Sequence, residues 1–252
     1  MSTLVRPHNF FARFSKIVLF TSLFSLLACN GNGDYSRLAD DPDTEQVTES
    51  PSQAENVEET PVVEETPIVS ESSQVSILAK YNHLDPYRVV PTKALSTALV
   101  YYEQNKSKFP NKNYISLIDF SKSSRQKRFF IIDMNSGGVW AITVAHGKGS
   151  DSNHDGFADR FSNTSGSNAS SLGYYKAAET YSGKHGLSLR LDGLSSTNSR
   201  ARSRAIVIHG ASYVKDSSVI QGRSWGCPAV SMANRTKVIN ALKGGTMIYA
   251  FK

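Results

Sequence analysis

Cysteine, long apolar runs and nucleic-acid-binding motifs are scarce or absent in this chain of 252 residues. Only two cysteines occur, Cys29 and Cys227, so each one needs an explanation of its own. The apolar run at residues 17–27 is too short to cross a bilayer as a stable helix, which needs roughly 20 residues. The lack of any recognisable nucleic-acid-binding motif argues against nucleic acid as a partner.

The N-terminus has the features of an export signal, because three basic residues precede the apolar run and Cys29 follows it. The ending LLAC resembles the lipobox of bacterial lipoproteins, in which the cysteine becomes the lipidated first residue. This resemblance implies a signal peptide at residues 1–29, a membrane anchor at Cys29 and a place on the periplasmic side of the cell envelope. Asn30 after the cysteine favours the outer membrane. The alternative is an ordinary cleaved signal with an incidental cysteine.

Residues 30–76 lack aromatic side chains after Tyr35 and contain 12 Asp or Glu against a single Arg. Such a segment buries too little apolar surface to offset the entropy of ordering it. We therefore expect a disordered, acidic and extended tether before the globular part, which begins at residue 77.

Acidic side chains are in turn scarce in residues 77–252, which hold 24 Lys and Arg but 10 Asp and Glu, a net charge of +14. A basic exported domain is attracted to anionic polymers such as a cell wall or a membrane surface. An ordinary solvated surface is the alternative.

The pattern of apolar residues predicts a mainly β domain with a few peripheral helices. Residues 91–109 carry apolar side chains at helical spacing, and a second helix is expected within residues 232–245, before Gly244 and Gly245. Between them, β-branched and aromatic runs alternate with Gly, Asn and Ser, which is typical of mostly antiparallel strands. The runs are YISLIDF, RFFIIDM, VWAITVAHG, LGYYKAAETY, LSLRLDG, RAIVIHG and TMIYAF.

Cys227 lies between Gly226 and Pro228, a setting that favours a tight turn over a strand. A thiol nucleophile needs a base, because at its ordinary pKa near 8.5 only a few per cent is thiolate at pH 7. His209, which ends the run RAIVIHG, is the best candidate. A buried inert thiol and a satisfied core histidine are the alternatives.

Together these residues resemble a family. His209 and Gly210, followed after 13 residues by SWGC (224–227), are similar to the signature of the YkuD-type L,D-transpeptidases of bacterial peptidoglycan. The match is closest to the branch with RSxGCPAV and spans roughly residues 115–250. The resemblance implies an antiparallel β-sandwich or barrel-like catalytic domain that requires no cofactor.

Two residues depart from the family pattern. Trp225 replaces a second histidine, so His209 is left as the only histidine base of the motif, and Ala229 replaces an arginine that helps to hold substrate. Arg190 and Arg223 are the candidates for that task, each with a plain surface charge as the alternative. Trp225 itself and Tyr213 are further candidates for lining the substrate pocket. The roles of His146 and His185 are left open.

The resemblance implies acyl transfer on peptidoglycan tetrapeptide stems through a thioester on Cys227, which forms 3-to-3 cross-links. His209 would move the protons, Gly226 and Cys227 would offer backbone N–H groups to the oxyanion, and Ser224 would hydrogen-bond within the loop or to substrate. Three alternatives stay open: an L,D-carboxypeptidase, a catalytically silent wall-binding lipoprotein, and a cysteine peptidase with another substrate.

The stretch DSNHDGFAD (151–159) resembles part of a calcium loop. It places oxygen ligands on four residues, with Gly156 at the sharp turn. The four are Asp151, Asn153, Asp155 and Asp159. Because Ser162 stands where a bidentate carboxylate is usual, a polar turn without metal is the alternative.

Overall fold

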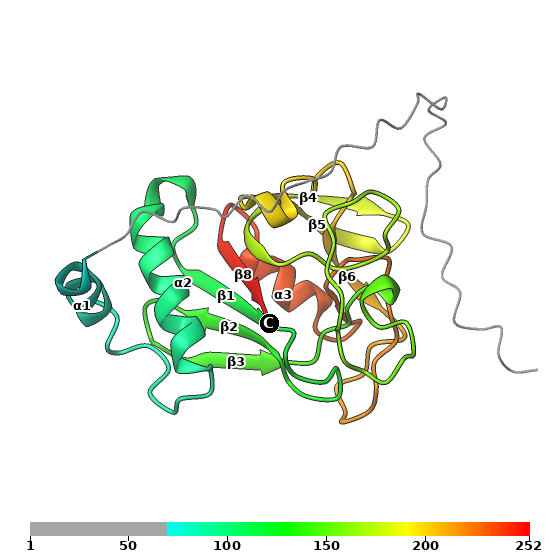
Figure 1. The fold of residues 1–252 in the computed structure, drawn as a ribbon, viewed down its shortest axis with the longest axis horizontal. Coiled ribbons are helices and arrows are strands. Elements are labelled where there is room, and N and C mark those ends of the chain that lie inside the picture. The colour runs from blue at the N-terminus through cyan, green and yellow to red at the C-terminus, as the bar shows by residue number, and fades with distance from the viewer. Residues whose placement is uncertain (1–69) are drawn as a thin grey trace, which may run out of the picture. The chain divides into compact units, whose positions relative to one another are not determined.

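The computed structural model describes residues 70–252 of the chain (Figure 1). The predicted signal peptide, the lipidation site Cys29 and the tether up to residue 69 lie outside the described residues. The helices are α1 (Glu71–Ala79), α2 (Thr92–Gln104) and α3 (Arg235–Leu242). The strands are β1 (Tyr114–Asp119), β2 (Phe129–Asp133), β3 (Val139–Ile142), β4 (Gly173–Gly183), β5 (Gly186–Gly193), β6 (Val207–Ala211), β7 (Ala229–Ser231) and β8 (Met247–Phe251).

All eight strands form one sheet in the order β3-β2-β1-β8-β4-β5-β6-β7. Most neighbours are antiparallel, as the alternating runs predicted, and the mainly β fold class is confirmed. Two pairs, β1 with β8 and β6 with β7, are parallel. Sequence patterns did not indicate β7, because its three residues are too few to show a period.

The sheet nearly closes into a barrel. The chain that leaves β3 at one edge runs alongside β7 at the other edge, where the N–H of Ala145 donates to the carbonyl of Ala229 at 2.9 Å. Gly147 then forms a parallel bridge with Ser224. We call this contact of residues 145–148 with residues 224–229 the seam. It brings Cys227 next to a segment about 80 residues earlier in the chain.

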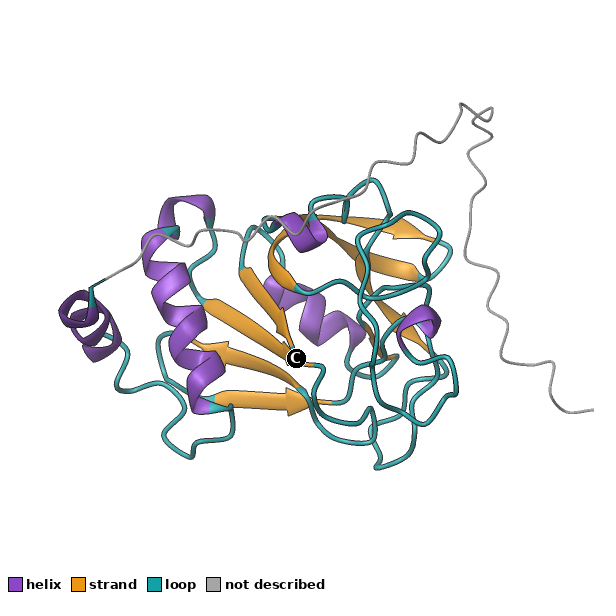
Figure 2. Ribbon diagram, viewed as in Figure 1, coloured by secondary structure: helices purple, strands orange, loops and turns teal. Residues whose placement is uncertain are grey.

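Two apolar clusters bury both faces of the central strands. Phe129 and Ile131 of β2 pack with the buried residues of α3 in one cluster, and Phe130 and Ile132 pack with those of α2 in the other. A strand buried on both faces needs an uninterrupted apolar run, which is why β2 reads FFIID. Figure 2 shows α2 lying across the β1–β3 end of the sheet.

The helices differ from prediction at their ends. The helix expected over residues 91–109 ends at Gln104, and a short 3₁₀ turn over Lys106–Lys108 follows. Helix α1 covers residues 71–76, which were predicted to be the last part of the tether. It buries none of its residues, so no apolar periodicity marks it in the sequence. No helix within residues 70–252 is long and apolar enough to cross a membrane.

Candidate active site

Cys227 lies in the loop before β7, where its side chain is half-buried. Its Sγ is 3.7 Å from the carbonyl oxygen of Ala205, to which the thiol donates. Gly226, just before it, has φ of +121°, and an added Cβ would lie 2.8 Å from the carbonyl oxygen of Ala169. Only glycine fits there, so the backbone bend that carries the thiol depends on Gly226.

His209 lies in β6 and is 2% exposed. In the parallel ladder it is the partner of Ala229, and Cys227 comes two residues before Ala229. Both residues therefore come to the same end of the β6–β7 pair. The Nδ1 of His209 lies 3.1 Å from the carbonyl oxygen of Gly210. Because a carbonyl only accepts, Nδ1 carries a proton, so Nε2 is the ring nitrogen that can act as the base.

The ring of His185 lies against that of His209, with centroids 4.4 Å apart and an interplanar angle of 35°. His185 lies between β4 and β5, and its carbonyl oxygen accepts a hydrogen bond from Nη1 of Arg235 at 3.3 Å. A ring packed in this way limits the rotation of the His209 imidazole. His185 is thus placed beside the candidate base.

Ser224 braces the cysteine loop from within. Its Oγ accepts from the N–H of Gly226 at 3.1 Å and donates to the carbonyl of Cys227 at 2.6 Å. Ser224 was predicted to hydrogen-bond either within the loop or to substrate, and the structure contains the bonds within the loop. The N–H of Gly226, expected to be an oxyanion donor, is therefore already bonded to Ser224 in this conformation.

The seam fixes the loop from outside. The N–H of Ser224 donates to the carbonyl of His146 at 2.9 Å, and the N–H of Lys148 donates to the carbonyl of Ser224 at 2.7 Å. Ser170 connects the two sides, since its Oγ accepts from the N–H of Gly147 at 3.0 Å and donates to the carbonyl of Gly226 at 3.1 Å. These bonds hold residues 224–226, which lead directly into Cys227.

A buried polar network, Arg128–His146–Asp151, lies beneath the seam. Nη2 of the fully buried Arg128 is 2.8 Å from Nδ1 of His146, whose Nε2 is 3.0 Å from Oδ2 of Asp151. Burial, together with the nearby Arg128 charge, lowers the pKa of His146 to about 4, so the ring is neutral at pH 7. Arg128 then donates to Nδ1, and Nε2–H donates to Asp151. His146, held by this network, thus helps to hold the seam in position.

Asp151 also holds the turn of residues 151–159, the predicted calcium loop. Its carboxylate accepts the N–H groups of Asp155 and Gly156, both at 3.1 Å. Burial raises the pKa of Asp151, but the hydrogen bonds from His146 and from Gly156 N–H bring it below its usual range.

The other predicted calcium ligands have partners within the protein. Asp155 accepts from Asn153 Nδ2 at 3.1 Å and from the N–H of Phe157 at 2.8 Å, and Asp159 lies 3.7 Å from the ammonium of Lys252. No group of three or more His, Cys, Asp or Glu within residues 70–252 is arranged to hold a metal. Calcium binding stays a prediction, and the hydrogen bonds of this stretch form the polar turn that was its alternative.

Three of the four predicted substrate-binding residues, Arg223, Tyr213 and Trp225, lie in or near the cysteine loop. Arg223 donates to the carbonyl oxygen of Asp151, and Tyr213 packs against Gly222, where an added Cβ would lie 2.7 Å from its ring. Trp225 is half-buried, and the ammonium of Lys148 lies 5.4 Å from its ring centroid. Arg223 is thereby engaged in holding the turn after the seam.

Arg190 is held elsewhere, since its Nε lies 3.3 Å from Glu179 and its guanidinium covers the ring of Tyr181 at 4.3 Å. Sequence reasoning missed two residues that support the site: Ser170, which bonds to the cysteine loop, and Arg128, which bonds to His146. Each looks like an ordinary polar residue in the sequence, and only the fold brings it to its partners.

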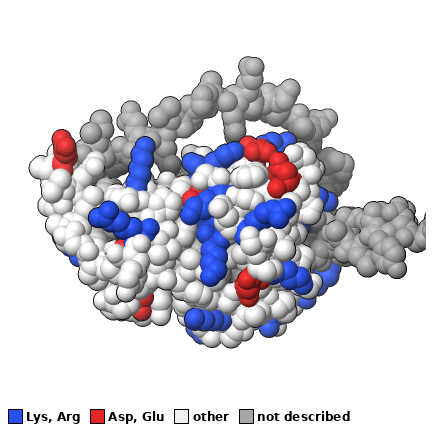
Figure 3. Space-filling view, turned by 90° about the horizontal axis from the view of Figure 1, so that it is seen from below, with Lys and Arg blue, Asp and Glu red and all other residues white. Residues whose placement is uncertain are grey.

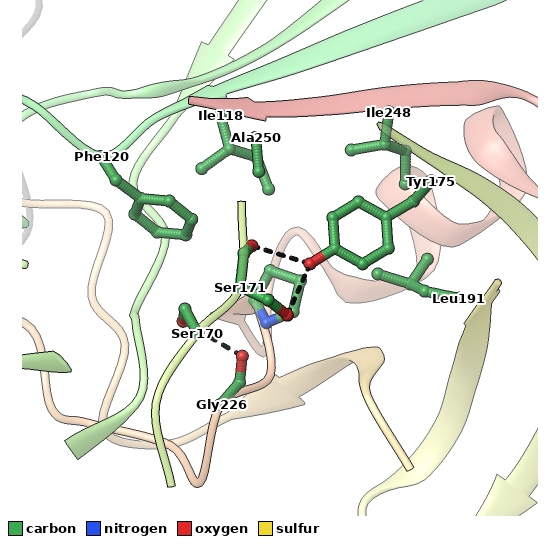
Figure 4. A pocket seen from close by; sticks show the side chains of 10 residues that line it. Ile118, Phe120, Ser170, Ser171, Tyr175, Leu191, Gly226, Ile248 and Ala250 are labelled. Carbon is green, nitrogen blue, oxygen red and sulfur yellow. Dashed lines mark hydrogen bonds between the residues drawn. The ribbon is translucent and has the colours of Figure 1, made fainter. Parts of the chain in front are cut away.

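A small pocket of about 10 Å³ lies behind the loop (Figure 4). Its wall includes Gly226, Pro228, Ser170 and Ser171 on the loop side and Tyr175 on the opposite side. Tyr175 is buried and donates its O–H to the carbonyl of Ser171 at 2.7 Å. The pocket is about the size of one water molecule, so the backbone of Gly226 rests on a well-filled interior.

A family model described as an L,D-transpeptidase catalytic domain matches residues 87–251. The match covers more than half of the chain and includes His209 and Cys227. The chain therefore belongs to the L,D-transpeptidase catalytic domain family, and the resemblance seen in the sequence is confirmed at that level. No match is found among the curated proteins.

Solved structures with a similar fold include L,D-transpeptidases from three bacteria. The one from Mycobacterium smegmatis is 14% identical over 56% of this chain and 59% of its own, with a TM-score of 0.35. L,D-transpeptidase 1 of Mycobacterium tuberculosis is 14% identical over 56% and 62%, with a TM-score of 0.32. The one from Stackebrandtia nassauensis is 11% identical over 72% and 77%, with a TM-score of 0.35. The chain thus spans about three fifths of the two mycobacterial proteins.

Proposed function

We propose that the chain is a murein L,D-transpeptidase of the RSxGCPAV branch that uses Cys227 as its nucleophile and His209 as its base. The observation that carries the proposal is the β6–β7 register, in which His209 pairs with Ala229, two residues after Cys227. A thiol on a half-buried turn, at the end of the strand pair that carries a histidine with Nε2 available as a base, is what acyl transfer requires.

The reaction begins when Nε2 of His209 takes the proton of the Cys227 thiol. The thiolate then attacks the carbonyl carbon of the bond between diaminopimelate and D-Ala in a tetrapeptide stem. As the tetrahedral intermediate collapses, the imidazolium gives its proton to the departing amine of D-Ala, which leaves a thioester on Cys227. The side-chain amine of a second diaminopimelate loses a proton to His209, attacks the thioester and releases the thiol.

The oxyanion of each tetrahedral intermediate needs N–H donors aimed at it. We propose backbone N–H groups of the cysteine loop for this role. The N–H of Gly226 joins in only if its bond to Ser224 opens, and Ser224 then keeps its bond to the carbonyl of Cys227. The Ser224 hydroxyl therefore still stabilises the loop while the backbone N–H groups bind the oxyanion.

The surface charge supports a peptidoglycan partner. Lys and Arg outnumber Asp and Glu by 24 to 10 over residues 77–252, and Figure 3 shows basic side chains spread over one face of the domain. Such a surface is attracted to anionic wall polymers. Within this proposal, the lipid on Cys29 and the acidic tether would hold the domain within reach of the wall from the outer membrane.

Purified chain incubated with a disaccharide-tetrapeptide tests the proposal by the mass of the products. Transfer gives a cross-linked dimer with loss of D-Ala, whereas transfer to water gives a tripeptide and identifies an L,D-carboxypeptidase. We expect the dimer from the native chain and no turnover from Cys227→Ala. Equal products from both chains would exclude Cys227 catalysis, and no product from either would favour the silent wall-binding alternative.

A further inference from the structure

Arg204, in the turn before β6, donates only to neutral oxygens. Its Nη1 reaches the carbonyl of Ser162 at 2.7 Å and Oγ of Ser171 at 3.3 Å. Its Nη2 reaches the carbonyl of Ala169 at 2.6 Å and Oγ of Ser167 at 3.3 Å. These four acceptors tie residues 162–171 to the guanidinium. The Nη hydrogens are thereby all used within the protein.

The same guanidinium lies directly behind the cysteine loop. A Cβ placed on Gly226 would be 3.3 Å from Nη2 of Arg204 and 2.8 Å from the carbonyl of Ala169 that Nη2 holds. Gly226 is bonded to Cys227, so a cation lies behind the peptide unit that presents the thiol. The bare Cα of Gly226 is what permits this approach.

The charge of Arg204 is not neutralised by a carboxylate. Among the described residues, its hydrogen bonds all go to uncharged groups, and no Asp or Glu pairs with it. Burial lowers the pKa of Arg204. An arginine stays protonated at neutral pH even so.

We propose that Arg204 supplies a fixed positive charge that favours the thiolate of Cys227. The inference rests on the proposed function in one respect, namely that Cys227 is the nucleophile. Because the Nη hydrogens are all engaged, Arg204 acts through its charge and by positioning the loop, and it does not grip a substrate carboxylate. The thiol thus has a permanent cation in addition to His209.

The other titratable groups around Cys227 do not provide the same effect. Burial raises the pKa of Tyr175 to about 12, so it stays neutral, and Lys148 is exposed and lies over the ring of Trp225. His209 is a base that gains and loses its proton during the reaction. Arg204 is the group among these four that is both permanently charged and held by several hydrogen bonds.

The guanidinium of Arg204 is connected by hydrogen bonds to Ser171 and Tyr175, two residues behind the loop that Figure 4 labels. Ser171 Oγ accepts from Arg204 and lies 2.9 Å from the hydroxyl of Tyr175, which itself donates to the carbonyl of Ser171. Ser171 Oγ–H therefore donates to the Tyr175 oxygen. This chain of hydrogen bonds keeps the guanidinium in one orientation.

The test is the rate at which iodoacetamide alkylates Cys227 in the purified full chain, measured from pH 5 to pH 10 by the mass of the peptide that contains Cys227. We expect Arg204→Gln to slow alkylation at pH 7 by about tenfold, because loss of a nearby opposite charge shifts a titration by about one unit or more. The rates should converge at pH 10, where every thiol is ionised.

Two variants separate charge from scaffolding. Arg204→Lys keeps the charge and loses the planar fork, so we expect a pH profile near the native one together with a lower Tm. Arg202→Gln removes an exposed arginine two residues away, which pairs with Glu179 and Asp192, and should leave the profile unchanged.

A native alkylation rate at pH 7 in folded Arg204→Gln would overturn the proposal. If that variant does not fold, Arg204→Lys carries the test, and a midpoint moved up to that of an ordinary thiol would overturn it. Alkylation needs no peptidoglycan. A chain that is alkylated as expected but gives no product from the disaccharide-tetrapeptide therefore contradicts the proposed function and leaves the Arg204 inference standing.

Discussion

At the scale of single residues, the site depends on how the thiol is presented. The Ser224 hydroxyl both donates and accepts a hydrogen bond within the loop, and Gly226 supplies a backbone angle that other residues rarely adopt. Cys227 is thereby held half-buried on a turn and not within a strand. The sequence indicated this turn through the glycine and proline on either side of the cysteine.

Gly226→Ala should therefore damage both stability and reactivity. The methyl group would meet the carbonyl of Ala169 at 2.8 Å at a φ of +121°, and we expect a loss of about 1 to 3 kcal/mol in the free energy of unfolding. Gly166→Ala is the matched control, because Gly166 also has positive φ, +73°, but nothing lies within 4 Å of an added Cβ. Denaturant unfolding measures both, and equal losses would show that the close approach at Gly226 is unimportant.

At the scale of elements, the seam explains why two distant segments make one site. The strands β1 to β6 and β8 could be predicted from apolar runs, because burial imposes a period on the sequence. The three-residue β7 and the contact of residues 145–148 with the cysteine loop could not, because hydrogen bonds between distant backbone groups leave no local pattern. The side-chain hydrogen bonds of Arg128 and Arg204 leave no local pattern either, because most of their partners lie more than ten residues away in the sequence.

The buried network at the seam predicts a dependence of stability on pH. The pKa of His146 falls from 6.5 to about 4 on folding, so between these values the unfolded chain binds a proton that the folded chain does not. Stability is then fully present above pH 6.5 and is lost as pH falls toward 4, by up to about 3 kcal/mol.

Urea unfolding at pH 4.5, 5.5 and 7 measures this slope. His146→Gln should unfold at lower urea at pH 7 and lose much of the dependence on pH in this range. His83→Gln changes an exposed histidine and should keep the native slope. A native chain equally stable at pH 4.5 and pH 7 would contradict a neutral, buried His146.

At the scale of the whole molecule, charge is divided along the sequence. Residues 30–76 are strongly acidic and residues 77–252 strongly basic. If the basic domain is drawn to anionic wall polymers, binding to isolated sacculi should weaken several-fold when NaCl rises from about 0.05 to 0.5 M, because salt screens exposed charges. Co-sedimentation measures this binding. Binding that does not change with salt would assign the attraction to groups other than the surface charges.

The central claim is that Cys227, assisted by His209, forms the acyl intermediate. The most direct test incubates the native chain with a carbapenem, whose strained amide acylates an activated thiol, and locates the added mass by peptide mapping. We expect one adduct on the Cys227 peptide, none in Cys227→Ala and formation slowed by about 100-fold in His209→Gln. An adduct that persists in Cys227→Ala, or that forms at the native rate without His209, would contradict the account.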